Sequence, residues 1–293
     1  MDLAYLRAHP QHLPTFLTHQ RIRETPVSGG DVSAASRLTL DDGTSIFAKT
    51  WPSGAPPAGF FEAEAAGLRW LRSAGAVPVP EVLVELSTML AMGWVDAGPP
   101  SAAAAASFGR SLAALHRSGA PSFGADRPGF IGPLPLDNTR SQGPWSEWFA
   151  AFRLRPYLRQ SADRGALSGA DVRAVEQIID TIHQYEVSEP PARIHGDLWP
   201  GNLLWALDGR VWLVDPAAHG GHRETDLATL ALFGGAPHLE TILAAYDEVF
   251  PLAEGWRARV PLHQLHLLLV HTAVFGSAYR GAVRAAADAV LRA

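Results

Sequence analysis

The segment at residues 195–202, which reads HGDLWPGN, constrains this chain more than any other feature. It places an aspartate, Asp197, five residues before an amide, Asn202. A second aspartate, Asp215, follows the apolar run at 211–214, which predicts a strand that ends at this carboxylate. Carboxylate and amide oxygens are the ligands that Mg²⁺ prefers in proteins. The spacing therefore predicts one acid for proton transfer and a metal site at the strand end.

This spacing is similar to that of a kinase catalytic loop and its metal-binding strand end. Phosphoryl transfer needs two oxygens held in line and phosphate charge offset by metal, with little covalent work by the protein. Asp197 is then the group that accepts the proton of the attacking hydroxyl, and Asn202 and Asp215 hold magnesium on the nucleotide phosphates. The alternative is that these residues only form turns, since Asp, Gly and Asn are common there.

A lysine upstream supports the kinase hypothesis independently. Lys49 is the only lysine among the 24 basic residues, and it ends an alternating run that predicts a strand. A kinase uses an ammonium there to contact the nucleotide phosphates, paired with a glutamate on the next helix. The candidate partner is Glu64, which borders the apolar face of the helix expected after residue 59. The alternative for Lys49 is an ordinary lysine on a surface strand.

Two further segments are candidates for binding the nucleotide. Gly29 and Gly30 lie between two strand-like runs, where a backbone without side chains can approach phosphate and point its N–H groups at it. Such a hairpin turn is common, so its weight comes from its place before Lys49. Adenine is expected between the two lobes near Met92 and Trp94, with main-chain groups as hydrogen-bond partners.

Composition limits the class of protein. The 293 residues are 47% hydrophobic and 18% charged, as in an ordinary globular protein. A net charge of −5 without a basic block argues against nucleic acid as a partner, and no apolar run is long enough for a membrane span. Cysteine is absent, which predicts a cytoplasmic protein, either a monomer or a non-covalent dimer.

The pattern of elements predicts an α+β, protein-kinase-like fold with two lobes. An N-terminal lobe at 1–95 should hold a leading helix, five antiparallel strands and the one helix that carries Glu64. The Gly- and Pro-rich segment at 95–100 is the expected hinge. The C-terminal lobe at 96–293 should be mostly helical, with the catalytic loop and a hairpin between helices. Helices are expected at 102–116, 145–160, 168–185, 225–233, 239–250, 262–275 and 277–291.

Several segments resemble one family. The HGDLWPGN loop, the run HRETDLA at 222–228, GFIG at 129–132 and FGSAY at 275–279 are similar to those of the fructosamine/ketosamine-3-kinase family. That family shares its fold with aminoglycoside phosphotransferases and choline kinases. The resemblance extends from about residue 20 to residue 285. It implies an enzyme that uses ATP and Mg²⁺ to phosphorylate the 3-hydroxyl of ketosamines, which are sugars linked to an amine, as a deglycation repair.

The resemblance also implies an acceptor site, which is less clearly marked. Trp199 is expected to pack on the apolar face of the sugar, with core packing under the loop as the alternative. His219 and Glu224 are further candidates, although Glu224 could instead pair with Arg223. The chain departs from the family pattern near this site, at Leu136 and Val270 and at Ala218, His219 and Gly220, where bulkier aromatic residues are expected. The smaller residues are expected to open space for the acceptor.

Two other functions stay open at this point. One is a kinase for an aminoglycoside, a choline-like molecule or another amino alcohol, which would use the same machinery. The other is a kinase-shaped protein that binds nucleotide without catalysis. The intact set argues against the second, because it retains Lys49, Glu64, Asp197, Asn202 and Asp215.

Overall fold

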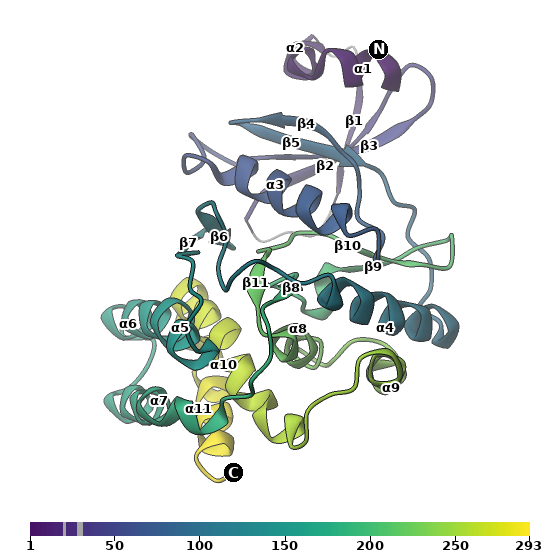
Figure 1. Ribbon diagram of the computed structural model, residues 1–293. Coiled ribbons are helices and arrows are strands. Elements are labelled where there is room, and N and C mark those ends of the chain that lie inside the picture. The colour runs from purple at the N-terminus through teal and green to yellow at the C-terminus, as the bar shows by residue number, and fades with distance from the viewer. Residues whose placement is uncertain (20–21, 28–31) are drawn as a thin grey trace.

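The structure is a computed structural model that describes residues 1–19, 22–27 and 32–293. The Gly29–Gly30 turn lies outside the described residues. An antiparallel sheet with helices on both of its faces forms the N-terminal part, and helices dominate the rest (Figure 1). This α+β arrangement confirms the predicted fold class.

The sheet has the strand order β1-β2-β3-β5-β4, and every neighbouring pair is antiparallel. Its strands are β1 (Arg23–Val27), β2 (Ala34–Thr39), β3 (Ser45–Thr50), β4 (Val82–Leu86) and β5 (Met89–Gly93). In β5, Leu90 and Met92 belong to the apolar cluster that contains the helix α3 (Phe60–Ser73), whereas Met89 and Ala91 face the leading helices. This alternation is the period of two that a strand buried on both faces requires.

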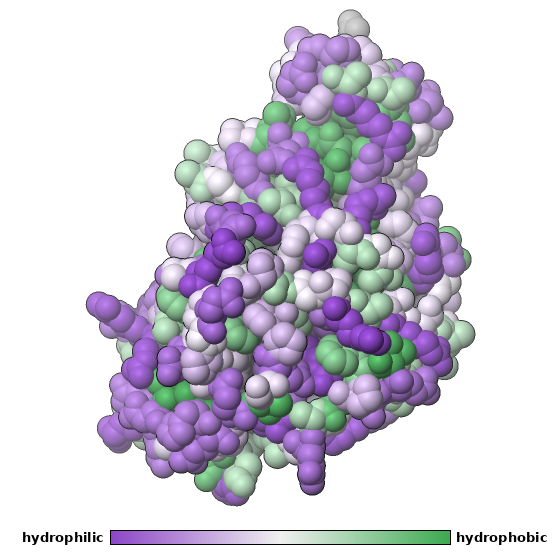
Figure 2. Space-filling model, in the orientation of Figure 1, coloured by the Kyte–Doolittle hydropathy of each residue, from purple (hydrophilic) through white to green (hydrophobic). Residues whose placement is uncertain are grey.

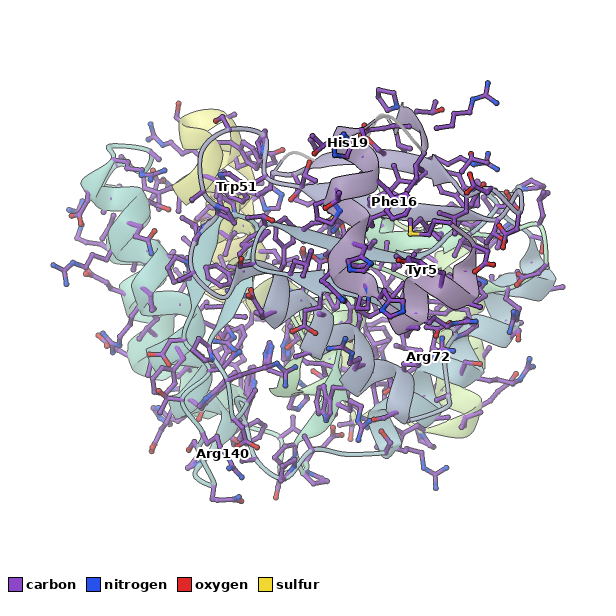
Figure 3. All side chains as sticks on the ribbon, turned by 90° about the horizontal axis from the view of Figure 1, so that it is seen from above. Tyr5, Phe16, His19, Trp51, Arg72 and Arg140 are labelled. Atoms are coloured by element: carbon purple, nitrogen blue, oxygen red, sulfur yellow. The ribbon has the colours of Figure 1, made fainter. Side chains whose placement is uncertain are left out.

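The leading segment forms two short helices rather than the single helix expected at 1–20. They are α1 (Leu3–Ala8) and α2 (Leu13–Thr18), separated by a 3₁₀ turn that begins at Pro10. Proline has no N–H to continue a helix, which accounts for the break. The two helices pack through Tyr5 and Phe16, whose ring centroids are 6.1 Å apart, and both side chains lie on the upper side of the molecule (Figure 3).

The C-terminal part is mostly helical (Figure 1). Its helices are α4 (Ala102–Arg117), α5 (Trp145–Phe149), α6 (Arg155–Asp163), α7 (Gly169–Thr181), α8 (Arg223–Thr229), α9 (Leu239–Val249), α10 (Trp256–Phe275) and α11 (Arg280–Val290). The predicted hairpin is present as β9 (Leu203–Trp205) and β10 (Val211–Leu213). The helix expected at 145–160 is interrupted by a π-helical turn, Ala150–Leu154, just before Pro156, whose missing N–H disturbs the regular ladder.

Two small strand pairs were not expected from the sequence. The hairpin of β6 (Gly129–Ile131) and β7 (Leu134–Leu136) lies beside α3, and β8 (Ala192–Ile194) pairs with β11 (His219–Gly221). The strands β8 and β11 have three residues each and lie far apart in the chain, so no local pattern marks their pairing. The second pair brings the start of the loop at 195–202 next to the segment that follows Asp215.

The segment expected as a hinge leads from β5 to α4 and contacts the β9–β10 hairpin. Gly98 N donates to Trp205 O at 2.7 Å, and Leu207 N donates to Asp96 O at 2.9 Å. A Cβ at Gly98 would lie 2.8 Å from the backbone of Ala206, so only glycine fits here. This connection positions β5 relative to the loop at 195–202.

The face in Figure 2 is mostly polar, with apolar residues gathered just below α1 and α2. Among the described residues, none of the helices combines the length and apolar character needed to cross a lipid bilayer.

Asp171 ties α7 to α11 and makes stability depend on pH. Burial alone would raise the pKa of Asp171, but hydrogen bonds from Ser168 and from Arg280 and Arg284 outweigh it and hold that pKa at about 2. A carboxyl whose pKa is depressed in the folded state stabilises the fold above its unfolded pKa of about 4 and loses this effect as pH falls.

We therefore expect Asp171→Asn to lower the melting temperature at pH 6, with the gap to wild type closing as pH falls below about 4. Thermal melts across this range check it. Asp163→Asn, at an exposed carboxylate 70% accessible to solvent, is the matched control. A gap that stays constant with pH would contradict the assigned interaction.

Candidate active site

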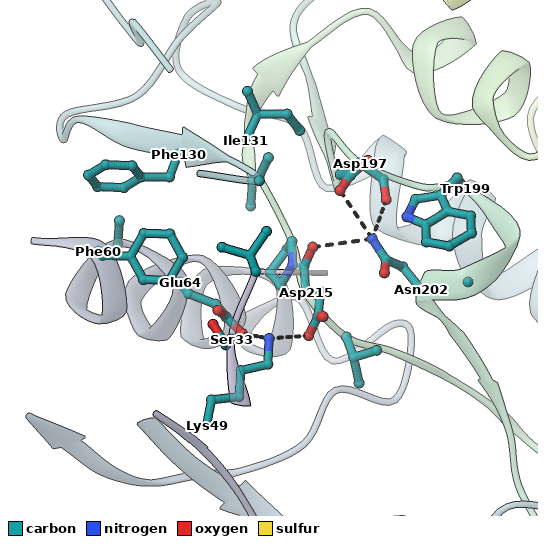
Figure 4. A pocket seen from close by; sticks show the side chains of 18 of the residues that line it. Ser33, Lys49, Phe60, Glu64, Phe130, Ile131, Asp197, Trp199, Asn202 and Asp215 are labelled. Carbon is teal, nitrogen blue, oxygen red and sulfur yellow. Dashed lines mark hydrogen bonds and ion pairs between the residues drawn. The ribbon is translucent and has the colours of Figure 1, made fainter. Parts of the chain in front are cut away.

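A cavity of about 730 Å³ lies between the sheet and the helical part (Figure 4). Its lining brings together residues that are far apart in the sequence, including Lys49, Glu64, Asp197, Asn202 and Asp215. The two glycines expected at the phosphates are outside the described residues, so their place relative to the cavity stays a prediction.

The amide of Asn202 joins the two predicted acids. Its Nδ2 donates to Asp197 O at 2.7 Å, to Asp197 Oδ2 at 3.3 Å and to Asp215 O at 3.4 Å (Figure 4). Asp215 itself has φ +57°, a left-handed backbone that is uncommon for aspartate and is found at functional sites. One amide therefore ties the carboxylate and backbone of Asp197 to the backbone of Asp215.

Two glycines in the loop are required by close contacts. Gly196 has φ +81°, and a Cβ there would lie 2.3 Å from Ala217 O. A Cβ at Gly201 would lie 2.1 Å from the Trp199 ring, so the indole packs directly over this residue. The residues between Asp197 and Asn202 thus set the position of Trp199 as well as that of the Asn202 amide.

Asp226 on α8 holds the start of the loop. Its carboxylate accepts hydrogen bonds from His195 N at 2.7 Å and Gly196 N at 2.9 Å, and it lies 3.1 Å from His116 Nε2. His195 Nε2 lies 2.9 Å from Val214 O, which connects the loop to the segment that leads to Asp215. A buried network whose members are all satisfied gives a rigid arrangement.

The lysine lies between two carboxylates. Lys49 Nζ is 2.7 Å from Glu64 Oε1 and 2.5 Å from Asp215 Oδ1 (Figure 4). Burial alone would lower the pKa of Lys49, but the charges of Asp215 and Glu64 outweigh it and raise the pKa, so the ammonium stays charged. Burial raises the pKa of Glu64 in turn. The spacing puts a fixed positive charge beside the predicted metal ligand.

Asp197 is poised to exchange a proton near neutral pH. Burial, together with the charge of Asp215, raises the pKa of Asp197 to about 7, against the opposing hydrogen bond from Asn202. A general base works best when its pKa lies near the working pH. A cation at Asp215 would offset part of the charge that raises this pKa.

The donor set fits Mg²⁺. Asp215 offers a carboxylate that is 40% exposed, and the hydrogen bonds of Asn202 within the described residues all use Nδ2, which leaves Oδ1 for a metal. Hard oxygen donors with room for phosphate oxygens and water suit this ion. These two residues would hold it, with Lys49 beside them.

Met92 and Trp94 are the residues expected beside adenine. Both line the cavity, with Gly93 and Val95 beside them. Arg37 stacks on the Trp94 ring at 4.7 Å, and Trp94 Nε1 donates to Asp96 Oδ1 at 2.9 Å, so the indole is fixed at the cavity edge. Their contact with adenine stays a proposal.

The expected acceptor residues divide into two groups. Trp199 lines the cavity, whereas His219 and Glu224 do not. Glu224 is buried and bonded to Arg259 at 2.6 and 2.8 Å, which corrects both the acceptor role and the pairing with Arg223. His219 is buried with Nδ1 2.7 Å from Ala217 O, so its ring is already engaged below the loop.

The residues that depart from the family pattern are also placed. Val270 lines the cavity, whereas Leu136 belongs to the core under the β6–β7 hairpin. A Cβ at Gly220 would lie 1.9 Å from Ser122 O, so the small residue serves backbone packing and opens no space for a substrate. Of the five departures, only Ala218 and Val270 line the cavity.

Sequence reasoning gave no role to three further lining residues. Arg127 and Asn138 flank the β6–β7 hairpin, and Phe275 ends α10. GFIG and FGSAY marked these regions only as resemblances, and no local pattern distinguishes Arg127 from other surface arginines.

Comparison with known proteins agrees with this geometry. The fructosamine kinase family profile matches residues 9–293. A Thermus thermophilus protein named a probable ketoamine kinase is 36% identical over 258 residues, which cover 88% of this chain and 90% of that protein. The chloroplastic protein-ribulosamine 3-kinase of Arabidopsis thaliana is 33% identical, with 91% and 82% of the two chains covered.

Solved structures of fructosamine kinases and of related kinases are also similar to this chain. A Thermobifida fusca protein assigned as a fructosamine-3-kinase has a TM-score of 0.88 and 52% identity, with 93% of this chain and 94% of that chain covered. The fold alone is shared with an aminoglycoside phosphotransferase bound to ADP and hygromycin B, at a TM-score of 0.66, 15% identity and coverage of 96% and 98%. The fold is also shared with a choline kinase of Cryptosporidium parvum, at a TM-score of 0.60 and 10% identity, with 99% of this chain and 94% of that chain covered. The chain therefore belongs to the fructosamine kinase family, and it is a phosphotransferase of protein-kinase-like fold.

Proposed function

We propose that this protein uses ATP and Mg²⁺ to phosphorylate the 3-hydroxyl of a ketosamine. The observation that carries the proposal is the arrangement of Asp197, Asn202 and Asp215 around one cavity with Lys49. The names of the relatives support the choice of acceptor, because they are ketoamine and ribulosamine kinases.

Each residue has a defined part in this reaction. ATP would supply the γ-phosphoryl group and Mg²⁺ would offset the charge of its phosphates. Asp197 orients the sugar hydroxyl and accepts its proton as the oxygen bonds to phosphorus and ADP leaves. Asn202 and Asp215 would hold the metal, and Glu64 would orient Lys49 toward the phosphates. Met92, Gly93 and Trp94 form the adenine edge, with Gly29 and Gly30 proposed over the phosphates.

Phosphorylation at this position would serve deglycation. A 3-phosphate makes the sugar–amine adduct unstable, so that the amine is released. The proposed partner is therefore a small or protein-borne ketosamine.

An acceptor panel tests the proposal. ATP consumption is measured with ribulosamine, erythrulosamine and fructosamine adducts of lysine, and with an aminoglycoside and choline for comparison. We expect turnover of at least one ketosamine and none of the other two compounds. Turnover of choline or the aminoglycoside alone would point to the other small-molecule kinases, and magnesium-dependent nucleotide binding without turnover would point to a silent relative.

Trp199→Ala tests the acceptor site. The indole lines the cavity and is assigned to the sugar face, so the KM for the acceptor should rise roughly tenfold or more while the KM for ATP changes little. Steady-state kinetics with each substrate varied in turn measure both constants. Trp94→Ala, at the adenine edge, should show the opposite pattern. Equal changes in both constants of Trp199→Ala would show that the indole only packs the loop.

A further inference from the structure

One cation of the cavity has no carboxylate bonded to it among the described residues. Arg127 lines the cavity just before β6, and its Nη2 is buried without a hydrogen-bond partner. Within the part of the chain that the structure describes, its guanidinium makes no hydrogen bond or ion pair. Lys49, by contrast, is held by two carboxylates. Arg127 is partly buried, and a buried nitrogen without a hydrogen-bond partner costs free energy, so its place in a cavity indicates a ligand that supplies an acceptor with negative charge.

The charge of the adjacent Asp126 attracts the Arg127 guanidinium, but Asp126 makes no ion pair with it among the described residues. Asp126 pairs with Arg140 on the outside of the hairpin, and its side chain is 74% exposed. Asn138 instead approaches Arg127, with its Nδ2 3.4 Å from Arg127 O, and it lines the same cavity. An amide and a guanidinium therefore border one region of the cavity wall without an acid between them.

A second arginine adds positive charge behind this wall. Arg153 is buried, and its guanidinium donates to Asn138 Oδ1 at 2.7 Å and to Asp137 O at 2.6 Å rather than to a carboxylate. Burial, with the charges of Arg153 and Arg127, holds the pKa of His219 well below its ordinary value. The wall therefore favours an anion.

The wall lies on the acceptor side. The β6–β7 hairpin stands at the opposite side of the molecule from the start of α4, which follows the hinge (Figure 1). Arg127 lies just before β6. Two residues of that strand, Phe130 and Ile131, lie across the cavity from Lys49 (Figure 4). His219, which feels the charge of Arg127, packs against Gly196, the neighbour of Asp197.

We propose that Arg127, with Asn138 beside it, binds an anionic group of the acceptor, a carboxylate or a phosphate, on the side of the cavity away from the hinge. This names the acceptor class more closely and rests on the proposed function. A ketosamine carries a carboxylate when its amine is an amino acid, and a phosphate when its sugar is a sugar phosphate. The planar guanidinium can donate two parallel hydrogen bonds to either group.

Three matched acceptors test this. They are the ribulosamine of propylamine, that of β-alanine, which adds a carboxylate, and the ribulosamine 5-phosphate of propylamine, formed from ribose 5-phosphate, which adds a phosphate. Wild type should show a KM roughly 10- to 100-fold lower for one of the two anionic adducts than for the neutral one. The preferred adduct identifies the source of the anion.

Substitution assigns the preference to Arg127. In Arg127→Met the KM of the preferred adduct should rise to that of the neutral adduct, while the neutral adduct and ATP keep their wild-type KM. If Arg127→Met does not fold, Arg127→Gln is used in its place. Arg155→Met is the matched control, because Arg155 is 58% exposed and lies 3.8 Å from Asp180 at the surface.

Three results would overturn the proposal. The first is that wild type has the same KM for the neutral adduct and both anionic adducts. The second is that Arg127→Met raises the KM of all three adducts equally. The third is that Arg127→Met raises the KM for ATP as much as the KM of the preferred adduct, which would place Arg127 on the nucleotide phosphates. If wild type turns over no ketosamine, the proposed function fails, and calorimetric binding to protein loaded with a non-hydrolysable ATP analogue decides the anion site separately. Tighter binding of an anionic adduct that Arg127→Met abolishes supports it, and equal binding refutes it.

Discussion

Asp197→Asn is expected to abolish nearly all turnover while binding of Mg–ATP persists. The asparagine keeps the size of the side chain but cannot accept the hydroxyl proton, and general-base catalysis contributes roughly 10²–10⁴-fold. Nucleotide binding should persist because Lys49, Asn202 and Asp215 surround the phosphate and metal positions separately. Single-turnover rates and calorimetric titration with Mg–ATP measure the two effects.

The pH profile gives an independent check of the same residue. Because the pKa of Asp197 is raised to about 7 by burial and by Asp215, the base loses activity as pH falls through this range. With metal at Asp215, the limb should lie at or below pH 7, and it should be absent from the residual activity of Asp197→Asn. Asp208→Asn, in the exposed turn of the β9–β10 hairpin, serves as the control. A variant that keeps more than about a tenth of the wild-type rate would remove Asp197 from the mechanism.

Lys49→Arg should also be severe, although arginine is the usual basic residue of this chain. The ammonium lies 2.7 Å from Glu64 and 2.5 Å from Asp215, and its side chain is 9% exposed. A planar guanidinium cannot replace a point charge in this space. Because the group stabilises charge on the phosphates, we expect a loss of kcat on the order of 10²-fold or more with the fold intact. Steady-state kinetics and circular dichroism test both parts.

The chain offers a direct probe of this site, because Lys49 is its single lysine. Selective ¹⁵N labelling of lysine side chains therefore gives one NMR signal, which should shift when Mg–ATP is added to wild type. A signal that ignores the nucleotide, together with near-normal kinetics in Lys49→Arg, would show that Lys49 only pairs with its two carboxylates. Arg69→Lys, at an arginine whose side chain is 53% exposed, is the control for replacing one basic residue by another.

The parts that the sequence predicted well depend on local pattern. Alternation and turns located the five strands, and the spacing from Asp197 to Asp215 located the loop and the strand end. The main departures have local causes that propensity alone did not weigh, such as Pro10 in the leading helix and Pro156 beside the π-helical turn.

The acceptor side was predicted less well because it depends on tertiary contacts. From the sequence, Glu224 was a candidate for binding the acceptor. In the structure it is bonded to Arg259 on α10, which lies 35 residues away in the chain. Gly220 looked like added space, but the backbone at Ser122 occupies the position of its side chain. Arg127 resembles any other arginine until the structure shows Asp126 engaged elsewhere. No local pattern can express where such partners lie.

The central claim is that the chain transfers phosphate to the 3-hydroxyl of a ketosamine. NMR of the product formed from Mg–ATP and a ribulosamine of lysine tests it most directly, because phosphorus–proton coupling identifies the phosphorylated carbon. The account predicts a single product with phosphorus coupled to the proton on C3, and none with Asp197→Asn. Phosphate on another hydroxyl, or no product from ribulosamine, erythrulosamine or fructosamine, would contradict it.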